Sequence, residues 1–181
     1  MDETFTIRDL KVSDFEDAAE LLSDKSKVIG LDRVDPILGE VAPAELKPSF
    51  VFERFSDLYK EILNGKAIAV VAESNKKVIG FCYAIGGKWP TNHVAELRSP
   101  IIFKDYVGKN IGGEMIKRIK EKSKDKFEIL SLVVSAADEI TLKKLESAYS
   151  NELGFVRWGL APKFYKKDDK YYPLIFMYSF I

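Results

Sequence analysis

The spacing of apolar and polar positions predicts helices and strands in a mixed order along the chain. Residues 4–10 alternate as a strand does, whereas 13–23 and 49–63 show helical spacing, with Ser13 as an N-cap and Asn64-Gly65 as a stop signal. The pattern weakens over 24–47, where Gly and Pro interrupt it. A stretch of that length without periodicity is typical of a functional loop.

Strand signals dominate the rest of the chain. Residues 67–73 and 78–85 predict a hairpin, and 93–103 and 129–135 predict two further strands. Helices are expected over 112–124 and from Asp138, a potential N-cap, to about residue 153. Short strands over 155–158 and 174–180, joined by a loop rich in Lys, Asp and Tyr, complete the order β-α-α-β-β-β-α-β-α-β-β. This order predicts an α+β fold in a single domain spanning 1–181.

The composition is that of a globular protein with balanced charge. The 181 residues are 46% hydrophobic and 31% charged, with 28 basic and 28 acidic side chains. Nucleic-acid binding usually requires a basic excess, so we expect no nucleic-acid partner. The single cysteine, Cys82, cannot form an internal disulfide. Because there is also no signal-peptide pattern and no apolar run near the ~18 residues of a membrane span, we expect a cytoplasmic protein without a membrane partner. The absence of Gln and the preference for Lys over Arg are a thermophile tendency.

The connection between the strand at 93–103 and the helix at 112–124 is a candidate ligand site. It contains Gly108, Gly112 and Gly113. Small residues let the backbone approach a ligand closely, and the free amides at a helix start suit a pyrophosphate. The pattern therefore predicts an anion site. A plain strand-to-helix turn is the alternative that glycine spacing alone leaves open.

The same connection resembles the signature of the GNAT superfamily of N-acetyltransferases, Arg/Gln-x-x-Gly-x-Gly/Ala, which often follows a Tyr. Tyr106-Val-Gly-Lys-Asn-Ile-Gly112 aligns with it, with Val107 at the Arg/Gln position and Asn110 at the first Gly position. Both depart from the signature, but Asn also tolerates a positive φ. Weaker matches follow in the family's order through nearly the whole chain: Ile7-Arg-Asp-Leu-Lys-Val-Ser-Asp14, Val78-Ile-Gly-Phe81, Ala95-Glu-Leu97 and Leu153-Gly-Phe155.

The resemblance implies a central mixed, mostly antiparallel twisted sheet of six to seven strands flanked by about four helices. It also implies a cleft between the fourth and fifth strands that takes acetyl-CoA as co-substrate. With one His and one Cys in the chain, we expect no metal site. Main-chain groups of the fourth strand would pair with the pantetheine arm, and an extra residue there suggests a bulge whose amides polarise the thioester. Amides of the following loop would hold the pyrophosphate. The cofactor-binding residues implied are Ile101, Ile102, Phe103, Val107, Gly108, Lys109, Asn110, Ile111, Gly112 and Gly113.

Acetyl transfer to an amine needs a proton acceptor, because alkyl amines with a pKa near ~10 are mostly protonated at neutral pH. The resemblance makes Glu96 the first candidate, since the family often has an acid there; a solvent-facing strand Glu is the alternative. His93 titrates in the useful range, but a lone loop histidine is more often a surface residue. Tyr149 is the candidate acid for the departing thiolate, although it lies one residue farther from Gly154-Phe155 than usual. Either the helix is bulged, or Tyr149 is a core residue and the acid lies elsewhere.

The acceptor pocket is expected among the 24–47 segment, the loop around Trp89 and the loop at 165–172. Acidic side chains there could attract a cationic amine and aromatic rings could flank it, whereas an ordinary solvated surface is the alternative. We assign Trp89, Glu40 and Tyr165 to this pocket. Exposed edge strands and the apolar segment 174–181 leave a monomer and a homodimer both open.

The sequence thus predicts an acetyl-CoA-dependent N-acetyltransferase. It would acetylate a primary amine of a small molecule or protein by direct transfer in a ternary complex. One alternative is a catalytically silent acyl-CoA-binding sensor or regulatory module, which the departures at Val107 and Asn110 motivate. Another is an interaction domain of the same fold that binds no CoA.

Overall fold

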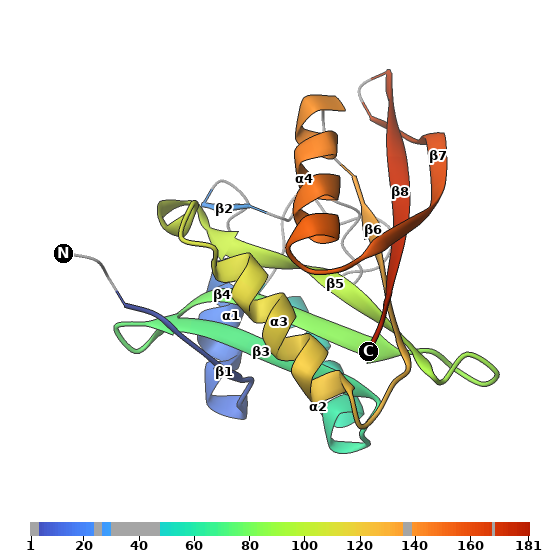
Figure 1. The fold of residues 1–181 in the computed structure, drawn as a ribbon. Coiled ribbons are helices and arrows are strands. Elements are labelled where there is room, and N and C mark those ends of the chain that lie inside the picture. The colour runs from blue at the N-terminus through green and yellow to red at the C-terminus, as the bar shows by residue number, and fades with distance from the viewer. Residues whose placement is uncertain (1–3, 24–26, 30–47, 136–138, 168) are drawn as a thin grey trace.

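The computed structural model describes residues 4–23, 27–29, 48–135, 139–167 and 169–181, and it confirms the predicted mixed α+β fold (Figure 1). One twisted sheet of eight strands has the order β1-β3-β4-β5-β6-β8-β7, with β2 paired to β5. All pairings between these strands are antiparallel except that of β5 with β6. Glu40 and Asp138 lie outside the described residues.

Apart from the extra strand β2, the helices and strands follow the predicted order. The strands are β1 (Thr6–Asp9), β2 (Val28–Ile29), β3 (Ala67–Ser74), β4 (Lys77–Gly86), β5 (Val94–Phe103), β6 (Ile129–Val134), β7 (Val156–Lys167) and β8 (Lys170–Phe180). The helices are α1 (Phe15–Ser23), α2 (Pro48–Leu63), α3 (Ile111–Ser123) and α4 (Glu139–Asn151), and short 3₁₀ turns cover Val12–Asp14 and Lys104–Tyr106.

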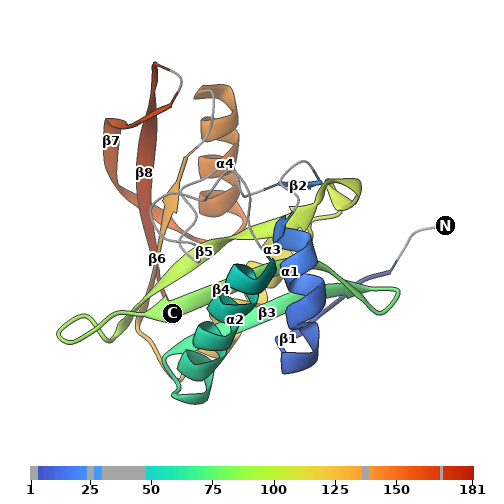
Figure 2. The same ribbon diagram turned by 180° about the vertical axis from the view of Figure 1, so that it is seen from behind.

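Helices cover the sheet from both sides, so each face has its own core. Helices α1 and α2 pack behind β3, β4 and β5, as Figure 2 shows from the back, and their core includes Phe15, Phe55 and Phe81. On the other face α3 lies across β3, β4 and β5, and α4 packs against β6 and β7 (Figure 1). The core under α3 and α4 includes Met115 and Met177.

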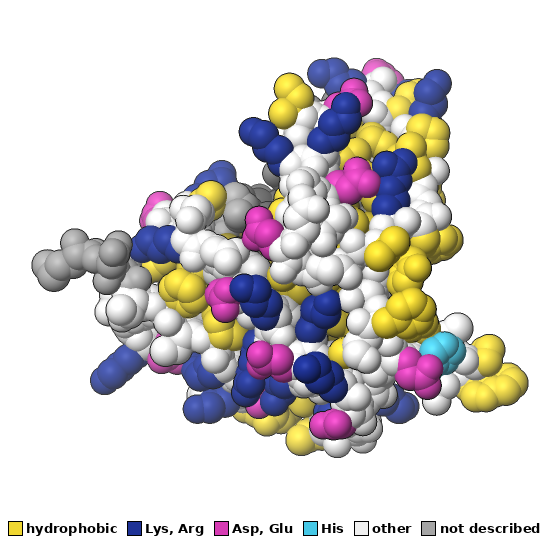
Figure 3. All heavy atoms as spheres, in the orientation of Figure 1, with side chains coloured by type: hydrophobic (Ala, Val, Ile, Leu, Met, Phe, Trp, Pro, Cys, Tyr) yellow, Lys and Arg dark blue, Asp and Glu magenta, His cyan; other side chains and the backbone are white. Residues whose placement is uncertain are grey.

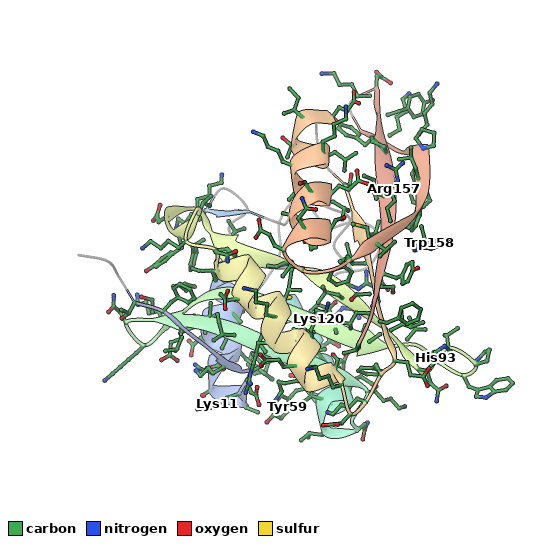
Figure 4. All side chains as sticks on the ribbon, in the orientation of Figure 1. Lys11, Tyr59, His93, Lys120, Arg157 and Trp158 are labelled. Atoms are coloured by element: carbon green, nitrogen blue, oxygen red, sulfur yellow. The ribbon has the colours of Figure 1, made fainter. Side chains whose placement is uncertain are left out.

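The sheet is divided into two halves between β5 and β6. These strands pair at Val94 with Ile129, at Ala95 with Leu130 and at Glu96 with Ser131, and then part. Lys120 of α3 crosses the division (Figure 4): its Nζ donates to the Leu153 carbonyl at 2.7 Å and to Ser179 Oγ at 2.8 Å. Burial, and to a smaller extent Lys124, lowers the pKa of Lys120. The half-buried ammonium therefore ties α3 to the end of α4 and to β8.

Two segments differ from the pattern-based expectation. The short strand β2 lies in the stretch where no periodicity was visible, because two residues are too few to show alternation. The loop expected between residues 158 and 174 is instead the long β7–β8 hairpin, which reaches to Lys167 and resumes at Lys170. Pro162 is tolerated because β7 is an edge strand and the register shifts between Ala161 and Tyr165.

Arg8 and Asp14 join β1 to the start of α1. Arg8 Nη1 and Nη2 donate to the two oxygens of Asp14 at 2.7 and 2.9 Å, and the Lys11 amide donates to Oδ2 at 2.8 Å. Burial raises the pKa of Asp14, but these hydrogen bonds outweigh burial and leave the pKa below its usual value. A lowered folded-state pKa stabilises the fold above the unfolded-state pKa of about 3.9, and this contribution is lost as the pH falls through the folded-state pKa.

Asp14→Asn should therefore lower the free energy of unfolding by about 2 kcal/mol near neutral pH and by much less at about pH 2. Urea unfolding at the two pH values, followed by circular dichroism, measures the difference. The control is Asp57→Asn, which removes an exposed partner of Lys60 and should cost less than about 0.5 kcal/mol. An equal loss for Asp14→Asn at both pH values would contradict the ionic origin of the effect.

Candidate active site

Strand β5 carries a bulge in its second half. Arg98 pairs with Tyr83 and Ile101 pairs with Phe81, so two residues of β5 face one residue of β4. The extra residue in this strand predicted such a bulge. Pro100 lies within it, where the missing N–H removes no ladder hydrogen bond. The bulge lies in the part of β5 that has already separated from β6.

Cys82 is the residue of β4 opposite the bulge. Its side chain is fully buried, and Sγ donates to the Arg98 carbonyl at 3.2 Å. Burial strongly raises the pKa of the thiol. A buried thiol of this kind is a poor nucleophile, so Cys82 contributes packing and one bond to the bulge.

The edge of β5 that faces β6 is partly taken by β2. Val28 pairs with Phe103 and Ile29 pairs with Ile102, while the other edge of Ile102 pairs with β4. Because a strand has two edges, β2 must lie on the edge from which β6 has separated. The Lys104 amide extends this pairing by donating to the Lys27 carbonyl at 2.8 Å.

Glu96 forms an ion pair with Arg98 at the point where β5 and β6 part. Glu96 Oε2 lies 2.7 Å from Arg98 Nη2, and the two side chains are 39% and 26% exposed. Leu97, between them, belongs to the core under α3. Since side chains alternate along a strand, Glu96 and Arg98 point to the opposite face, on which α1 and α2 lie. An acid and a cation therefore share one side of the separated strands.

The loop after β5 contains two residues with a positive φ. Gly108 has φ +88° and Asn110 has φ +56°, so the Asn at the first signature Gly position adopts the left-handed conformation it was expected to tolerate. The Glu114 amide donates to the Asn110 carbonyl at 3.1 Å, which begins the α3 hydrogen bonds. The first amides of α3 have no acceptor within the helix and face the loop.

Small residues let the start of α3 pack closely against β5 and against the Asn110 side chain. A Cβ on Gly112 would meet Ile102 Cδ1 and Pro100 Cγ at 3.4 Å, and a Cβ on Gly113 would lie 2.4 Å from Asn110 Oδ1. The start of α3 thus lies against the bulge of β5. The other assigned loop residues, Val107 and Lys109, are exposed, whereas Ile111 is buried under α3.

Positive side chains surround a hollow beside this loop. The hollow has a volume of about 440 Å³ and is lined by residues that include Lys27, Lys77, Lys104, Phe103 and Tyr106. Lys109 Nζ lies 5.0 Å from the centre of the Tyr106 ring. This charge favours an anionic ligand near the start of α3.

Tyr149 lies in the core under α4. It is 6% exposed, and its ring packs edge-to-face on Phe155 with the ring centres 6.0 Å apart. Ser150, which lies at the family's usual sequence distance from Gly154-Phe155, is half-buried. The acid role of Tyr149 stays a prediction.

His93 is exposed at the base of the β4–β5 hairpin (Figure 4).

Trp89 and Tyr165, the two described residues assigned to an acceptor pocket, lie in different hairpins. Trp89 is 85% exposed in the hairpin between β4 and β5, which extends away from the body of the molecule (Figures 1 and 2). Tyr165 of β7 pairs with Tyr172 of β8. Tyr171 and Tyr172 line a second hollow, of about 410 Å³, between α4 and the β7–β8 hairpin. Their role in binding an acceptor stays a prediction.

Hydrophobic side chains gather at the outer edge of the sheet, over β7 and β8 (Figure 3). Trp158, 65% exposed, lies with its ring 5.4 Å from that of Phe176, and Phe164 lies 6.2 Å from the same ring. Trp158 projects outward from β7 in Figure 4. A monomer and a homodimer both remain predictions for this chain.

Two features of the site were missed by sequence reasoning. Arg98 has no place in the signature, and its only sequence signal is its position two residues after Glu96 on a strand, which puts both on one face. The pairing of β2 with β5 joins residues more than seventy positions apart, and no local pattern predicts it.

Within the described ranges, no helix has the length and apolar content needed to cross a bilayer. In those same ranges, no three His, Cys, Asp or Glu side chains gather closely enough to hold a metal ion.

Known proteins resemble this chain in sequence pattern and in fold. A sequence model of the acetyltransferase (GNAT) family matches residues 33–155. The acetyltransferase of the GNAT family from Streptococcus pneumoniae is 16% identical, with a TM-score of 0.74 over 98% of this chain and 100% of that chain. Ribosomal-protein-alanine N-acetyltransferase from Brucella melitensis is 18% identical, with a TM-score of 0.72 over 97% and 99%.

A third structure contains the co-substrate. The GNAT superfamily phosphinothricin acetyltransferase from Sinorhizobium meliloti, in complex with acetyl-CoA, is 20% identical, with a TM-score of 0.73 over 98% of this chain and 89% of that chain. At sequence identities this low, the structural similarity shows that the fold is shared. Comparison of the sequence with curated proteins gave no match.

Proposed function

This chain belongs to the GNAT acetyltransferase family, and from that premise we propose that it transfers the acetyl group of acetyl-CoA to a primary amine of a small molecule or a protein. The observation that carries the proposal is the open stretch of β5. It begins where β6 separates, contains a bulge, and leads into a glycine loop at the start of α3. Glu96 lies where this stretch begins, and the proposed pyrophosphate site lies where it ends.

The residues present fit both the pyrophosphate and the thioester of acetyl-CoA. The amides from Val107 to Gly113 and the neighbouring lysines would hold the pyrophosphate. Gly112 lies against the bulge of β5, since a Cβ there would touch Ile102 and Pro100, and this brings the start of α3 next to the main-chain groups of β5. Main-chain amides at the bulge would donate to the thioester oxygen. Acetyl-CoA supplies an activated acyl group whose leaving group is a thiolate.

Glu96 would accept a proton from the acceptor ammonium, which leaves a neutral amine. The amine nitrogen then forms a bond to the acetyl carbon, and the carbon–sulfur bond breaks. Tyr149 is our candidate for giving a proton to the sulfur, and the second proton that the nitrogen loses on becoming an amide returns to Tyr149, directly or through water. The products are the N-acetylated acceptor and CoA, and the proton held by Glu96 passes to solvent.

We expect acetyl-CoA to displace β2. The arm and β2 would use the same main-chain edge at Ile102 and Phe103, and β2 is only two residues long. Lys27 and Lys104 are a hydrogen-bonded pair, so the Ile29 amide faces β5 and the Val28 amide does not. Amide hydrogen exchange of Ile29 should become faster, on the order of tenfold, when acetyl-CoA saturates the protein. Amides of α2 serve as the internal control. Unchanged or slower exchange in β2 would mean that the arm does not follow this edge.

The test of the proposed function is calorimetric titration with acetyl-CoA and with CoA, followed by thioester turnover over a panel of amines. Micromolar binding of acetyl-CoA together with turnover of at least one amine is the expected result. Binding without turnover over a broad panel would favour the silent acyl-CoA-binding module. Folded protein that binds neither compound would leave only the fold in common with the family.

A further inference from the structure

Arg98 places a cation in the candidate active site, although acetyl transfer to a simple amine does not require one. It follows Glu96 by two residues on β5 and pairs in register with the buried Tyr83 of β4. Its position is the last one before the bulge. Arg98 is therefore the residue next to the bulge whose main-chain groups are proposed to contact the thioester.

The guanidinium uses only part of its hydrogen-bonding capacity. Nη2 contacts Glu96 at 2.7 Å. Nε is buried and donates to no acceptor among the residues that the structure describes. Such an unsatisfied N–H costs about 1–3 kcal/mol, and each one in a folded protein calls for an explanation. Nε and Nη2 together form the edge that binds a carboxylate through two parallel hydrogen bonds, and Glu96 occupies only half of it.

The ion pair engages one of the two oxygens of Glu96 that could receive a proton. Oε2 is the atom in contact with Arg98. To accept a proton from a substrate at that oxygen, Glu96 must leave Arg98, and a guanidinium left without an anion in a partly buried site is costly. An acceptor that brings its own anion removes this cost.

We propose that Arg98 binds a carboxylate of the acceptor, so that the acceptor is an α-amino acid or a close analogue with a carboxylate beside its amine. The inference rests on the proposed acetyl transfer. The ammonium and carboxylate of an α-amino acid are separated by one carbon, and Glu96 and Arg98 present the opposite charges 2.7 Å apart. When the acceptor binds, its carboxylate takes the Nε and Nη2 edge, and its ammonium meets the released Glu96. Glu96 and Arg98 therefore each have an oppositely charged partner both before and after the acceptor binds.

The test compares α-amino acids with their α-carboxamides, for example leucine with leucinamide, in steady-state acetylation assays. The two members of a pair share the side chain and differ in the carboxylate. The carboxamide also has the lower amine pKa and hence more of the neutral amine, so a preference for the acid cannot come from amine ionisation. Wild-type protein should have a kcat/KM about 30- to 100-fold higher for the acid, which corresponds to about 2–3 kcal/mol for a charge-assisted bidentate contact. Arg98→Gln should abolish this preference by raising KM for the acid alone, and Arg98→Lys should retain part of it. Arg118→Gln, which removes an exposed arginine paired with Glu121 on α3, is the matched control and should change neither value.

Each other outcome has a definite meaning. Equal losses for acid and carboxamide in Arg98→Gln would show that Arg98 acts only through Glu96, which overturns the inference. A wild-type preference for carboxamides or simple amines also overturns it, and this comparison needs no variant to fold. Turnover of simple amines alone refutes the inference and leaves the proposed function intact. Bound acetyl-CoA with turnover of no acceptor defeats both.

Discussion

Replacing Glu96 with Gln should reduce kcat/KM for acetyl transfer by about 100- to 10,000-fold, the usual effect of losing a general base. Glutamine keeps the size of the side chain and can still accept a hydrogen bond from Arg98 Nη2, but it cannot accept the proton of an ammonium. The acetyl-CoA affinity should not change, because the pyrophosphate loop lies at the far end of β5. Steady-state kinetics with a turned-over acceptor and calorimetric titration with acetyl-CoA measure the two quantities separately.

The pH dependence of this loss separates base catalysis from packing. As the pH rises toward the amine pKa of about 10, more of the acceptor is neutral without help, so the difference between Glu96→Gln and wild type should shrink. Glu53→Gln, on the exposed face of α2, is the control and should behave as wild type at every pH. A loss that is the same at all pH values would assign Glu96 a binding or structural role.

The framework of this fold was predictable because its signals are local. The N-terminus of α3 could be placed to within one residue from Gly112 and the apolar spacing after it, and the conformation of Asn110 follows from what Asn can adopt. The bulge in β5 was visible as one residue too many between Leu97 and Tyr106. Each of these features is determined by residues that are close in sequence.

The remaining features depend on contacts between distant parts of the chain. The β7–β8 hairpin is extended by partners on β8, and its Lys, Asp and Tyr composition was wrongly interpreted as a loop. A role for Arg98 follows only from its ion pair with Glu96 and from the separation of β5 from β6. No sequence signature marks either of these two features. For Tyr149 the sequence left a core role and an acid role open, and the structure adds its burial against Phe155.

Gly112→Asp should weaken acetyl-CoA binding by about 100-fold or more while the protein stays folded. A carboxylate at this position would stand where we place the pyrophosphate, and two like charges about 4 Å apart repel by about 4 kcal/mol at an effective dielectric constant of 20. The fold should tolerate the change, since a Cβ at Gly112 meets its nearest neighbours at 3.4 Å and an acid in the first turn interacts favourably with the helix dipole. Calorimetric titration gives the affinity, and thermal unfolding tests the fold.

Two further substitutions at Gly112 separate charge from size. Gly112→Asn has nearly the shape of Asp without its charge, and Gly112→Ala adds only a methyl group. If the phosphates bind at the start of α3, the order of affinities should be Gly, then Ala, then Asn, then Asp, and raising the salt concentration should narrow the gap between Asn and Asp. Equal affinities for Asn and Asp would mean that bulk at this position matters and charge does not. The phosphates would then lie away from α3, and the lysine-lined hollow beside Tyr106 would become the place to look for them.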